Sequence, residues 1–198
     1  VMKVKWLGHA SFLVTSDSGT TVITDPYKTG GVFEYDEIKE SADVVTVSHA
    51  HDDHNNVDAV QGNPEVISDA VEVEVKGIKF KGFPAYHDDA DGKDTGSNII
   101  FRFEVDGVKV CHLGDLGHRL SGEQVAEIGR VDILLAPVGG VFAIDARVAR
   151  EITEQLAPKV VMPMHYKTDR CDLPIAGVDE FLQKKPSVSK LNISEVEY

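Results

Sequence analysis

Short apolar runs separated by turn-forming residues dominate the first half of the chain, which is typical of β-strands. Strands are predicted at residues 3–7, 10–16, 20–25, 42–49, 70–77 and 78–87. Residues 98–115 are expected to form a hairpin that turns at Asp106 and Gly107, because an Asp-Gly pair tolerates the positive φ angles of a tight two-residue turn. Between these strands, residues 55–62 are predicted to form a short helix.

The second half of the chain alternates between helical and extended patterns. Helices are predicted at residues 121–129, 145–158 and 177–185, and strands at 131–138, 159–165 and 189–198. Ser121 and Asp145 stand where a side-chain oxygen can cap the first turn of a helix. Strands followed by strand–helix alternation indicate sheets with helices packed outside them, in one domain that spans residues 1–198.

The composition is that of an ordinary globular protein, with 42% hydrophobic and 27% charged residues. A formal net charge of −13 disfavours nucleic acid as a partner, because binding to phosphate backbones depends on clustered lysine and arginine. No apolar stretch reaches the roughly 18 residues that a membrane span needs, so no membrane partner is expected. Cys111 and Cys171 form neither a CxxC pair nor a disulfide framework, which predicts a reducing, cytoplasmic location.

Three histidines and two aspartates crowd into residues 49–54, HAHDDH, directly after a predicted buried strand. His49 and His51 lie two residues apart and therefore point to the same side of an extended chain. Asp53 and His54 follow where the chain must turn, which lets them reach a second point nearby. Imidazoles in an apolar interior need polar partners, and nitrogen ligands combined with carboxylates are what a site for two divalent metal ions requires.

The cluster resembles the HxHxDH signature of the metallo-β-lactamase superfamily. The resemblance extends along the chain through ITDP, YH, HLGDLG and PMHY, which contain Asp25, His87, Asp115 and His165. The segments WLGHASFLV and PVGG are similar to a branch of small hydrolases that includes ascorbate-phosphate lactonase-like proteins. This resemblance implies a four-layer αβ/βα sandwich of the α/β (α+β) class, with two mixed β-sheets, helices outside them and metal ions at one edge.

Carried over residue by residue, the resemblance implies a metal site in two halves. His49, His51 and His87 would hold the first ion, Asp53, His54 and His165 the second, and Asp115 would bridge both. Mixed histidine and aspartate ligands favour Zn²⁺, and Mn²⁺ or Fe²⁺ would also be accommodated. His112 competes with His87 as the third histidine of the first half, because it lies only three residues before Asp115.

Three further residues are candidates for supporting roles. Asp25 follows a predicted strand and resembles the superfamily's first aspartate, which supports the metal loop without binding metal. His9 either lines the site or makes a hydrogen bond in the core. Lys167, two residues beyond His165, is either a contact for an anionic substrate or an ordinary exposed lysine.

The site predicts a hydrolase with Asp53 and Asp115 as catalytic candidates. Two divalent ions, two carboxylates and one hydroxide leave a charge of about +1, which would attract an anionic group. A metal-bound hydroxide would then attack the ester, lactone or phosphoester bond of a small anionic substrate. His51 stands where redox di-iron relatives carry a carboxylate, and Asp115 where the best-known β-lactamases carry a cysteine, which disfavours both of those activities.

Two other functions are retained as hypotheses. One is a phosphodiesterase that acts on nucleotides or short nucleic acids, and the other is a non-catalytic metal-binding or sensing protein. A bridging carboxylate and an open position for water favour catalysis over storage. The sequence leaves the oligomeric state open, and a homo-oligomer is compatible with it.

Overall fold

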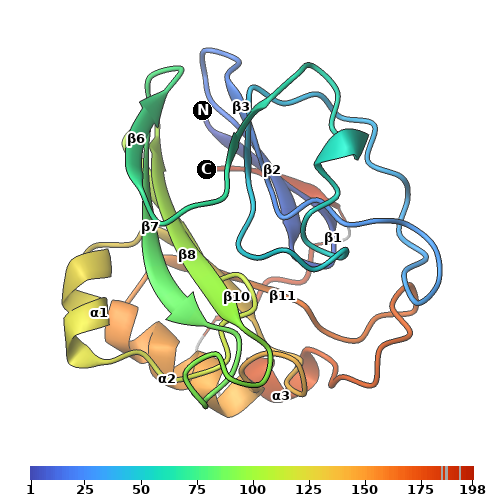
Figure 1. The fold of residues 1–198 in the computed structure, drawn as a ribbon, viewed down its shortest axis with the longest axis vertical. Coiled ribbons are helices and arrows are strands. Elements are labelled where there is room, and N and C mark those ends of the chain that lie inside the picture. Colours follow the sequence, from blue (N-terminus) through green and yellow to red (C-terminus); the bar gives the residue numbers. More distant parts are fainter. Residues whose placement is uncertain (184, 186, 192) are drawn as a thin grey trace.

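Two β-sheets face each other in the computed structural model, which describes residues 1–183, 185, 187–191 and 193–198 (Figure 1). The first sheet contains β1 (Lys3–Gly8), β2 (Ser11–Thr15), β3 (Thr21–Thr24), β4 (Val44–Thr46), β5 (Glu65–Ile67) and β12 (Glu195–Glu197). The second contains β6 (Glu72–Val75), β7 (Ile78–Tyr86), β8 (Ser97–Val105), β9 (Val108–His112), β10 (Ile133–Pro137) and β11 (Val160–Met164). Their strand orders are β12-β1-β2-β3-β4-β5 and β11-β10-β9-β8-β7-β6.

Both sheets are mixed, as expected. In the first sheet β3, β4 and β5 run parallel, and in the second β9, β10 and β11 do so, while the remaining pairs are antiparallel. The predicted hairpin is confirmed as β8 and β9, with φ angles of 52° at Asp106 and 78° at Gly107. Strand β5 was not predicted, because three residues followed directly by Ser68 and Asp69 carry too little alternation to be recognised.

The main core lies between the two sheets. Strand β7 alternates between buried and exposed side chains over its first three residues, as a strand with one face on a core does. Phe80 on β7 and Phe103 on β8 pack against each other with ring centroids 5.5 Å apart, and Val4 and Val14 of the first sheet belong to the same cluster. Burial of these side chains holds the sheets together through the hydrophobic effect.

Helices cover the outer face of the second sheet, where α1 (Gly122–Ile128), α2 (Ala146–Leu156) and α3 (Asp179–Leu182) lie together in Figure 1. Both predicted caps are confirmed. Ser121 accepts a hydrogen bond from the backbone of Gln124, and Asp145 accepts one from Val148 at 2.9 Å. None of the helices in the described part of the chain is long and apolar enough to cross a membrane.

Irregular segments cover the outer face of the first sheet, in place of the helical layer that the resemblance implied. Tyr27, Tyr35 and Ile38 pack there against Ile23 and Val45 of the sheet. The helix predicted at residues 55–62 is only the single 3₁₀ turn η1 (Val57–Ala59), since Asn56 makes no side-chain cap and Gly62 and Pro64 follow closely.

The last predicted elements are also shorter than expected. Helix α3 has four residues of the predicted range 177–185, in which Lys184 lies outside the described residues. Strand β12 has three residues of the predicted range 189–198, in which Asn192 lies outside the described residues.

Several strands end beside one another at the same edge of the sandwich. Histidine or aspartate residues follow directly or closely after β3, β4, β7, β9 and β11, and His9 lies between β1 and β2. Side chains at strand ends are held by the rigid sheet and still reach an open surface. The topology therefore brings polar groups that are distant in sequence to one place.

Candidate metal centre

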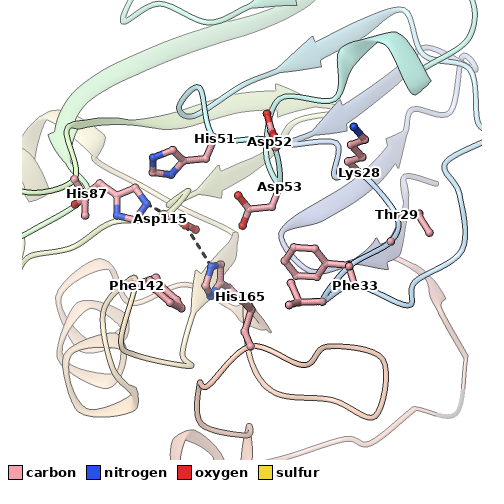
Figure 2. A pocket seen from close by; sticks show the side chains of 15 residues that line it. Lys28, Thr29, Phe33, His51, Asp52, Asp53, His87, Asp115, Phe142 and His165 are labelled. Atoms are coloured by element: carbon pink, nitrogen blue, oxygen red, sulfur yellow. Dashed lines mark ion pairs between the residues drawn. The ribbon is translucent and has the colours of Figure 1, made fainter.

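A cavity of about 590 Å³ opens at this edge, and five of the predicted metal ligands line it (Figure 2). These are His51, Asp53, His87, Asp115 and His165. The other two predicted ligands, His49 and His54, are buried behind them. The structure therefore brings all seven predicted ligands to one site.

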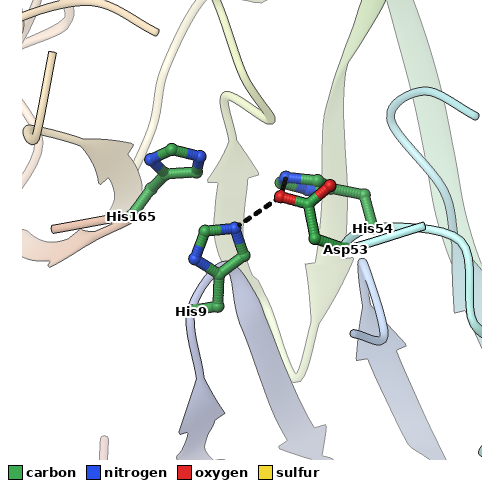
Figure 3. Close-up of side chains that lie close together, drawn as sticks. All are labelled: His9, Asp53, His54 and His165. Carbon is green, nitrogen blue, oxygen red and sulfur yellow. Dashed lines mark hydrogen bonds and ion pairs between the residues drawn. The ribbon is translucent and has the colours of Figure 1, made fainter. Parts of the chain in front are cut away.

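Histidine and aspartate side chains form three groups here, and within each group one nitrogen or oxygen of every side chain lies within 4.8 Å of the others. The first group is His49, His51 and His87, and the second is His9, Asp53, His54 and His165. The third is Asp25, His49 and His54, which shares one histidine with each of the other two. Figure 3 shows the second group, in which His9 Nε2 lies 3.0 Å from Asp53 Oδ2. The first group contains the three histidines predicted for the first ion, and the second contains Asp53, His54 and His165 together with His9.

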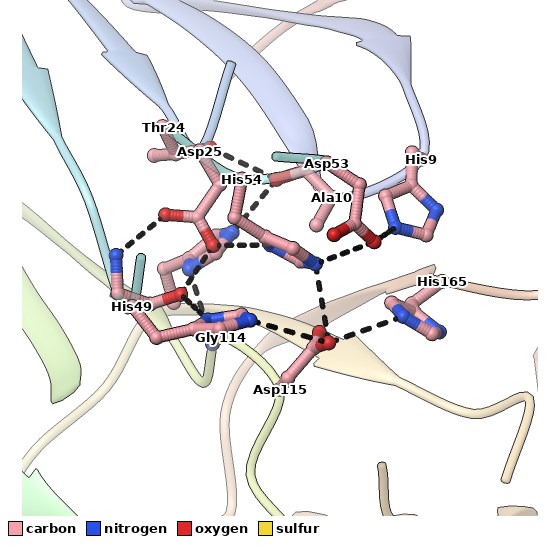
Figure 4. A network of polar contacts seen from close by, with 12 residues as sticks. His9, Ala10, Thr24, Asp25, His49, Asp53, His54, Gly114, Asp115 and His165 are labelled. Atoms are coloured by element: carbon pink, nitrogen blue, oxygen red, sulfur yellow. Dashed lines mark hydrogen bonds and ion pairs between the residues drawn. The ribbon is translucent and has the colours of Figure 1, made fainter. Parts of the chain in front are cut away.

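Asp115 adjoins both groups through a single carboxylate oxygen (Figure 4). Its Oδ2 lies 3.1 Å from His54 Nε2, 3.2 Å from His165 Nε2, 3.3 Å from His87 Nε2 and 3.7 Å from His49 Nε2. Four imidazole nitrogens thus converge on one buried anionic oxygen.

Asp25 and Ser48 orient two of these imidazoles from behind. Asp25 is fully buried and accepts hydrogen bonds from Ser48 N at 2.8 Å, Ser48 Oγ at 2.5 Å and His54 Nδ1 at 2.8 Å. Since the Ser48 hydroxyl donates to Asp25, it accepts from His49 Nδ1 at 2.9 Å. Both histidines therefore turn Nε2 toward Asp115, which is the orientation that a metal ligand needs.

The donor set fits a divalent metal ion. His49 Nε2 and Asp115 Oδ1 are buried, and neither has a hydrogen-bond partner within the part of the chain that the structure describes. Buried polar atoms without partners are costly, and lone pairs of nitrogen and carboxylate oxygen that face one another repel. A cation bound among them removes both penalties.

The electrostatics of the site favour positive charge at its centre. Burial alone would raise the pKa of the Asp115 carboxyl, but His165 and His54 outweigh it and hold that pKa well below its usual value. Burial would lower the pKa of His54, but Asp115, Asp25 and Asp53 together raise it well above its usual value. Burial lowers the pKa of His49 to about 3, so this imidazole is neutral at pH 7. Metal binding must therefore displace a proton from His54.

His87 and His112, the two competing histidines, have different surroundings. His112 Nε2 donates to the carbonyl of Ala10 at 2.8 Å, and its Nδ1 accepts from Gly114 N at 3.1 Å. Both ring nitrogens of His112 thus have backbone partners, and its side chain is fully buried. His87 lines the cavity and leaves Nδ1 without a partner among the described residues. The geometry favours His87 as the ligand and gives His112 a structural role.

Replacing each of these histidines by alanine should therefore have opposite effects. His112→Ala is expected to lower the free energy of unfolding by about 2–4 kcal/mol, through lost packing and two unpaired backbone groups, while metal content is retained. His87→Ala is expected to lower the metal content with a smaller loss of stability. Urea unfolding of the metal-free proteins and elemental analysis of the loaded ones measure the two effects. Loss of metal from His112→Ala, with metal retained in His87→Ala, would contradict this assignment.

Close backbone packing holds the loop that carries Asp115. Gly114 has a φ angle of 59°, and a Cβ atom at that position would lie 2.3 Å from Asn98 Oδ1. Asn98 is itself buried and accepts a hydrogen bond from Asp115 N at 2.9 Å. A Cβ atom on Gly117 would lie 2.2 Å from the backbone of His87. Glycine at both positions lets Asp115 and His87 approach each other.

Of the three candidates for supporting roles, Asp25 and His9 lie at the site and Lys167 lies outside the cavity lining. Asp25 supports two imidazoles as described, and His9 is buried with its ring 4.3 Å from that of His165. Lys167 forms an ion pair with Asp172 at 2.9 Å and lies outside the cavity lining. Sequence reasoning missed the other lining side chains, among them Lys28, Phe33, Phe142 and Leu173, because no local pattern marks them.

Comparison with known proteins assigns the family. Residues 3–165 match the family model of the β-lactamase superfamily domain. A UPF0173 metal-dependent hydrolase of Thermococcus onnurineus is 32% identical, covering 85% of this chain and 86% of that protein. A protein of the same name from Carboxydothermus hydrogenoformans is 34% identical and covers 92% of both chains.

Solved structures agree with this assignment. A crystal structure from Thermotoga maritima, of a protein proposed to be a zinc-dependent hydrolase of the metallo-β-lactamase superfamily, has a TM-score of 0.82 and 40% identity. It covers all of this chain and 92% of its own. Igni18, a metallo hydrolase of Ignicoccus hospitalis, has a TM-score of 0.67 and 26% identity, covering 92% of this chain and 89% of its own. With its histidine–aspartate metal-binding cluster, the chain belongs to the metallo-β-lactamase superfamily and is one of its metal-dependent hydrolases.

Proposed function

We propose that the protein is a dinuclear hydrolase that cleaves a small anionic ester, lactone or phosphoester. The observation that carries this proposal is the convergence of four imidazole nitrogens within 3.7 Å of one oxygen of Asp115. One ion would leave part of this donor set unpartnered, whereas two ions, one held by His49, His51 and His87 and one by Asp53, His54 and His165, would use all of it. Zinc suits the nitrogen-rich set, and Mn²⁺ and Fe²⁺ are the alternatives.

Bound ions would supply an activated water molecule and stabilise the negative charge that develops on the substrate. The chain's own residues prepare the site for this chemistry. Asp25 and Ser48 fix the orientation of His54 and His49, and Asn98 holds the backbone of Asp115. His9 holds the carboxylate of Asp53, which borders the cavity. Such pre-organisation lowers the cost of reaching the transition state.

Metal content tests the dinuclear proposal. Purified protein is stripped with a chelator, reloaded separately with Zn²⁺, Mn²⁺ or Fe²⁺, and analysed for bound metal. Two ions per chain are expected for at least one of these metals. A single equivalent in every case would contradict the dinuclear site.

Turnover tests the reaction class on the same preparations. Chromogenic esters, lactones and phosphodiesters are compared at equal protein concentration. Preference for esters or lactones supports the proposal, and preference for phosphodiesters would favour the phosphodiesterase hypothesis instead. Two bound ions without turnover of any compound would favour a binding or sensing role.

A further inference from the structure

Building on the proposed hydrolase function, we propose that the substrate carries an apolar acyl or aryl group, which binds against Phe33, Phe142 and Leu173 beside the metal centre. These three side chains line the same cavity as His165 and Asp115. In Figure 2, Phe33 and Phe142 lie on opposite sides of His165, so an apolar group held between them would place the scissile bond at the ligands.

Phe142 is presented to the cavity by a strained turn. Val141 has a φ angle of 65°, which is unfavourable for a β-branched residue, and Phe142 N donates to the carbonyl of Gly140 at 2.8 Å. Gly139 N donates to the carbonyl of His165 at 3.0 Å, which ties the base of this turn to a predicted ligand. Strained backbone that persists near a site indicates a functional constraint on the position of the side chain that it carries.

Backbone hydrogen bonds also fix the opposite wall of the cavity, which contains Phe33 and Leu173. The carbonyl of Val32 accepts a hydrogen bond from Asp172 N at 2.7 Å, which joins the loop containing Phe33 to the loop containing Leu173. Phe33 pairs with Cys171 in an antiparallel bridge, and its ring lies 4.5 Å from that of His9. The wall is therefore pre-formed, and little conformational entropy is lost when a ligand packs against it.

The exposed apolar side chains of the lining favour an apolar group here. Val32 and Phe142 are 40% and 41% exposed, although both are large apolar residues that line the cavity. Apart from the predicted ligands, the polar side chains of the lining are Lys28, Thr29, Asp52 and Thr95, with Lys28 as the one cation among the lining residues. A sugar or nucleotide would need more donors and acceptors than this wall offers, whereas an acyl or aryl group needs only the contact area.

Binding of simple carboxylates tests this inference without any requirement for turnover. Acetate, butanoate and octanoate are titrated calorimetrically into the metal-loaded protein, with octanoate kept below its micellar concentration. Octanoate is expected to bind about tenfold or more tightly than butanoate, because each added methylene group loses contact with water on binding. Phe142→Ala and Leu173→Ala are expected to reduce that ratio to about threefold or less and to leave acetate binding unchanged.

Val66→Ala is the matched control, because Val66 is 43% exposed on β5 and does not line the cavity. It should preserve the preference of the unmodified protein for octanoate. Equal binding of butanoate and octanoate would overturn the inference, as would an equal loss for all three carboxylates in Phe142→Ala. Thermal unfolding of each variant verifies that the fold is retained.

Turnover of p-nitrophenyl acetate, butanoate and octanoate separates this inference from the proposed function. A rise of kcat/KM with chain length that Phe142→Ala removes would support both. Preferential binding of octanoate with no hydrolysis of any ester would support the apolar site and contradict the hydrolytic proposal. Hydrolysis that is insensitive to chain length, with equal carboxylate binding, would support the hydrolase and overturn the apolar site.

Discussion

Asp115→Asn is expected to remove bound metal from both halves of the site and to lower kcat/KM by about a thousandfold or more. Asparagine keeps the shape of the side chain but loses the charge that balances the ions. Loss of about 4 kcal/mol of transition-state stabilisation corresponds to this factor and is within the range that metal catalysis supplies. Elemental analysis and turnover of the best chromogenic substrate measure the two effects.

The fold should survive this substitution. The asparagine amide can donate to one of the imidazole nitrogens that face Asp115 Oδ2 within 3.7 Å, which partly offsets the lost attraction between the carboxylate and His54. Metal-free Asp115→Asn should therefore still fold, and at pH 7 it should unfold at a lower urea concentration than the metal-free unmodified protein. Asp58→Asn is the control for loss of one negative charge, because Asp58 is exposed in η1. Retention of both ions in Asp115→Asn would remove the basis for a bridging carboxylate.

Asp25→Asn is expected to weaken metal binding by about 10- to 100-fold without removing any predicted ligand. Asp25 Oδ2 accepts from both Ser48 Oγ and His54 Nδ1, and Oδ1 accepts from Ser48 N. An amide nitrogen in either position would face a donor. If it replaces Oδ2, His54 must move its proton to Nε2 to avoid this conflict, and that nitrogen can then no longer bind a metal.

The same substitution should lower the free energy of unfolding of the metal-free protein by about 1–3 kcal/mol, because one buried donor loses its partner. Competition with a chromogenic chelator measures metal affinity, and urea unfolding measures stability. Asp43→Asn is a matched control, since Asp43 Oδ2 also accepts two hydrogen bonds, both from Thr21, away from the site. An equal loss of metal affinity in both variants would show that Asp25 acts through general stability and not through His54.

The position of Asp25 illustrates why a local motif describes a site incompletely. Residues 49–54 are recognisable because histidine and aspartate stand at short spacings after an apolar run. His54 and Asp25 are 29 residues apart, and only the parallel pairing of β3 with β4 brings the ends of their strands together. The family resemblance placed Asp25 in a supporting role, and the structure supplies the hydrogen bonds through which it acts.

The apolar wall formed by Phe33, Phe142 and Leu173 is a stronger example of a feature that no local motif describes. Phe142 follows a turn after β10, Phe33 lies in a loop without regular structure, and Leu173 lies in another. Their side chains line one cavity only because loop 30–34 pairs with loop 170–172 and the turn at 139–142 is tied to His165. Isolated aromatic residues in loops have no periodicity, so no sequence pattern could have selected them.

The sequence by itself determined most of the strands, the hairpin turn at Asp106 and Gly107, the helix caps and the metal-binding cluster. Each of these depends on residues that are close together in the chain, through side-chain alternation, backbone preference or capping. The tertiary structure alone decided that His112 bonds to the backbone of Ala10, 102 residues away, and that loops cover the first sheet. These features depend on packing and hydrogen bonds between distant segments, which exist only once both sheets have assembled.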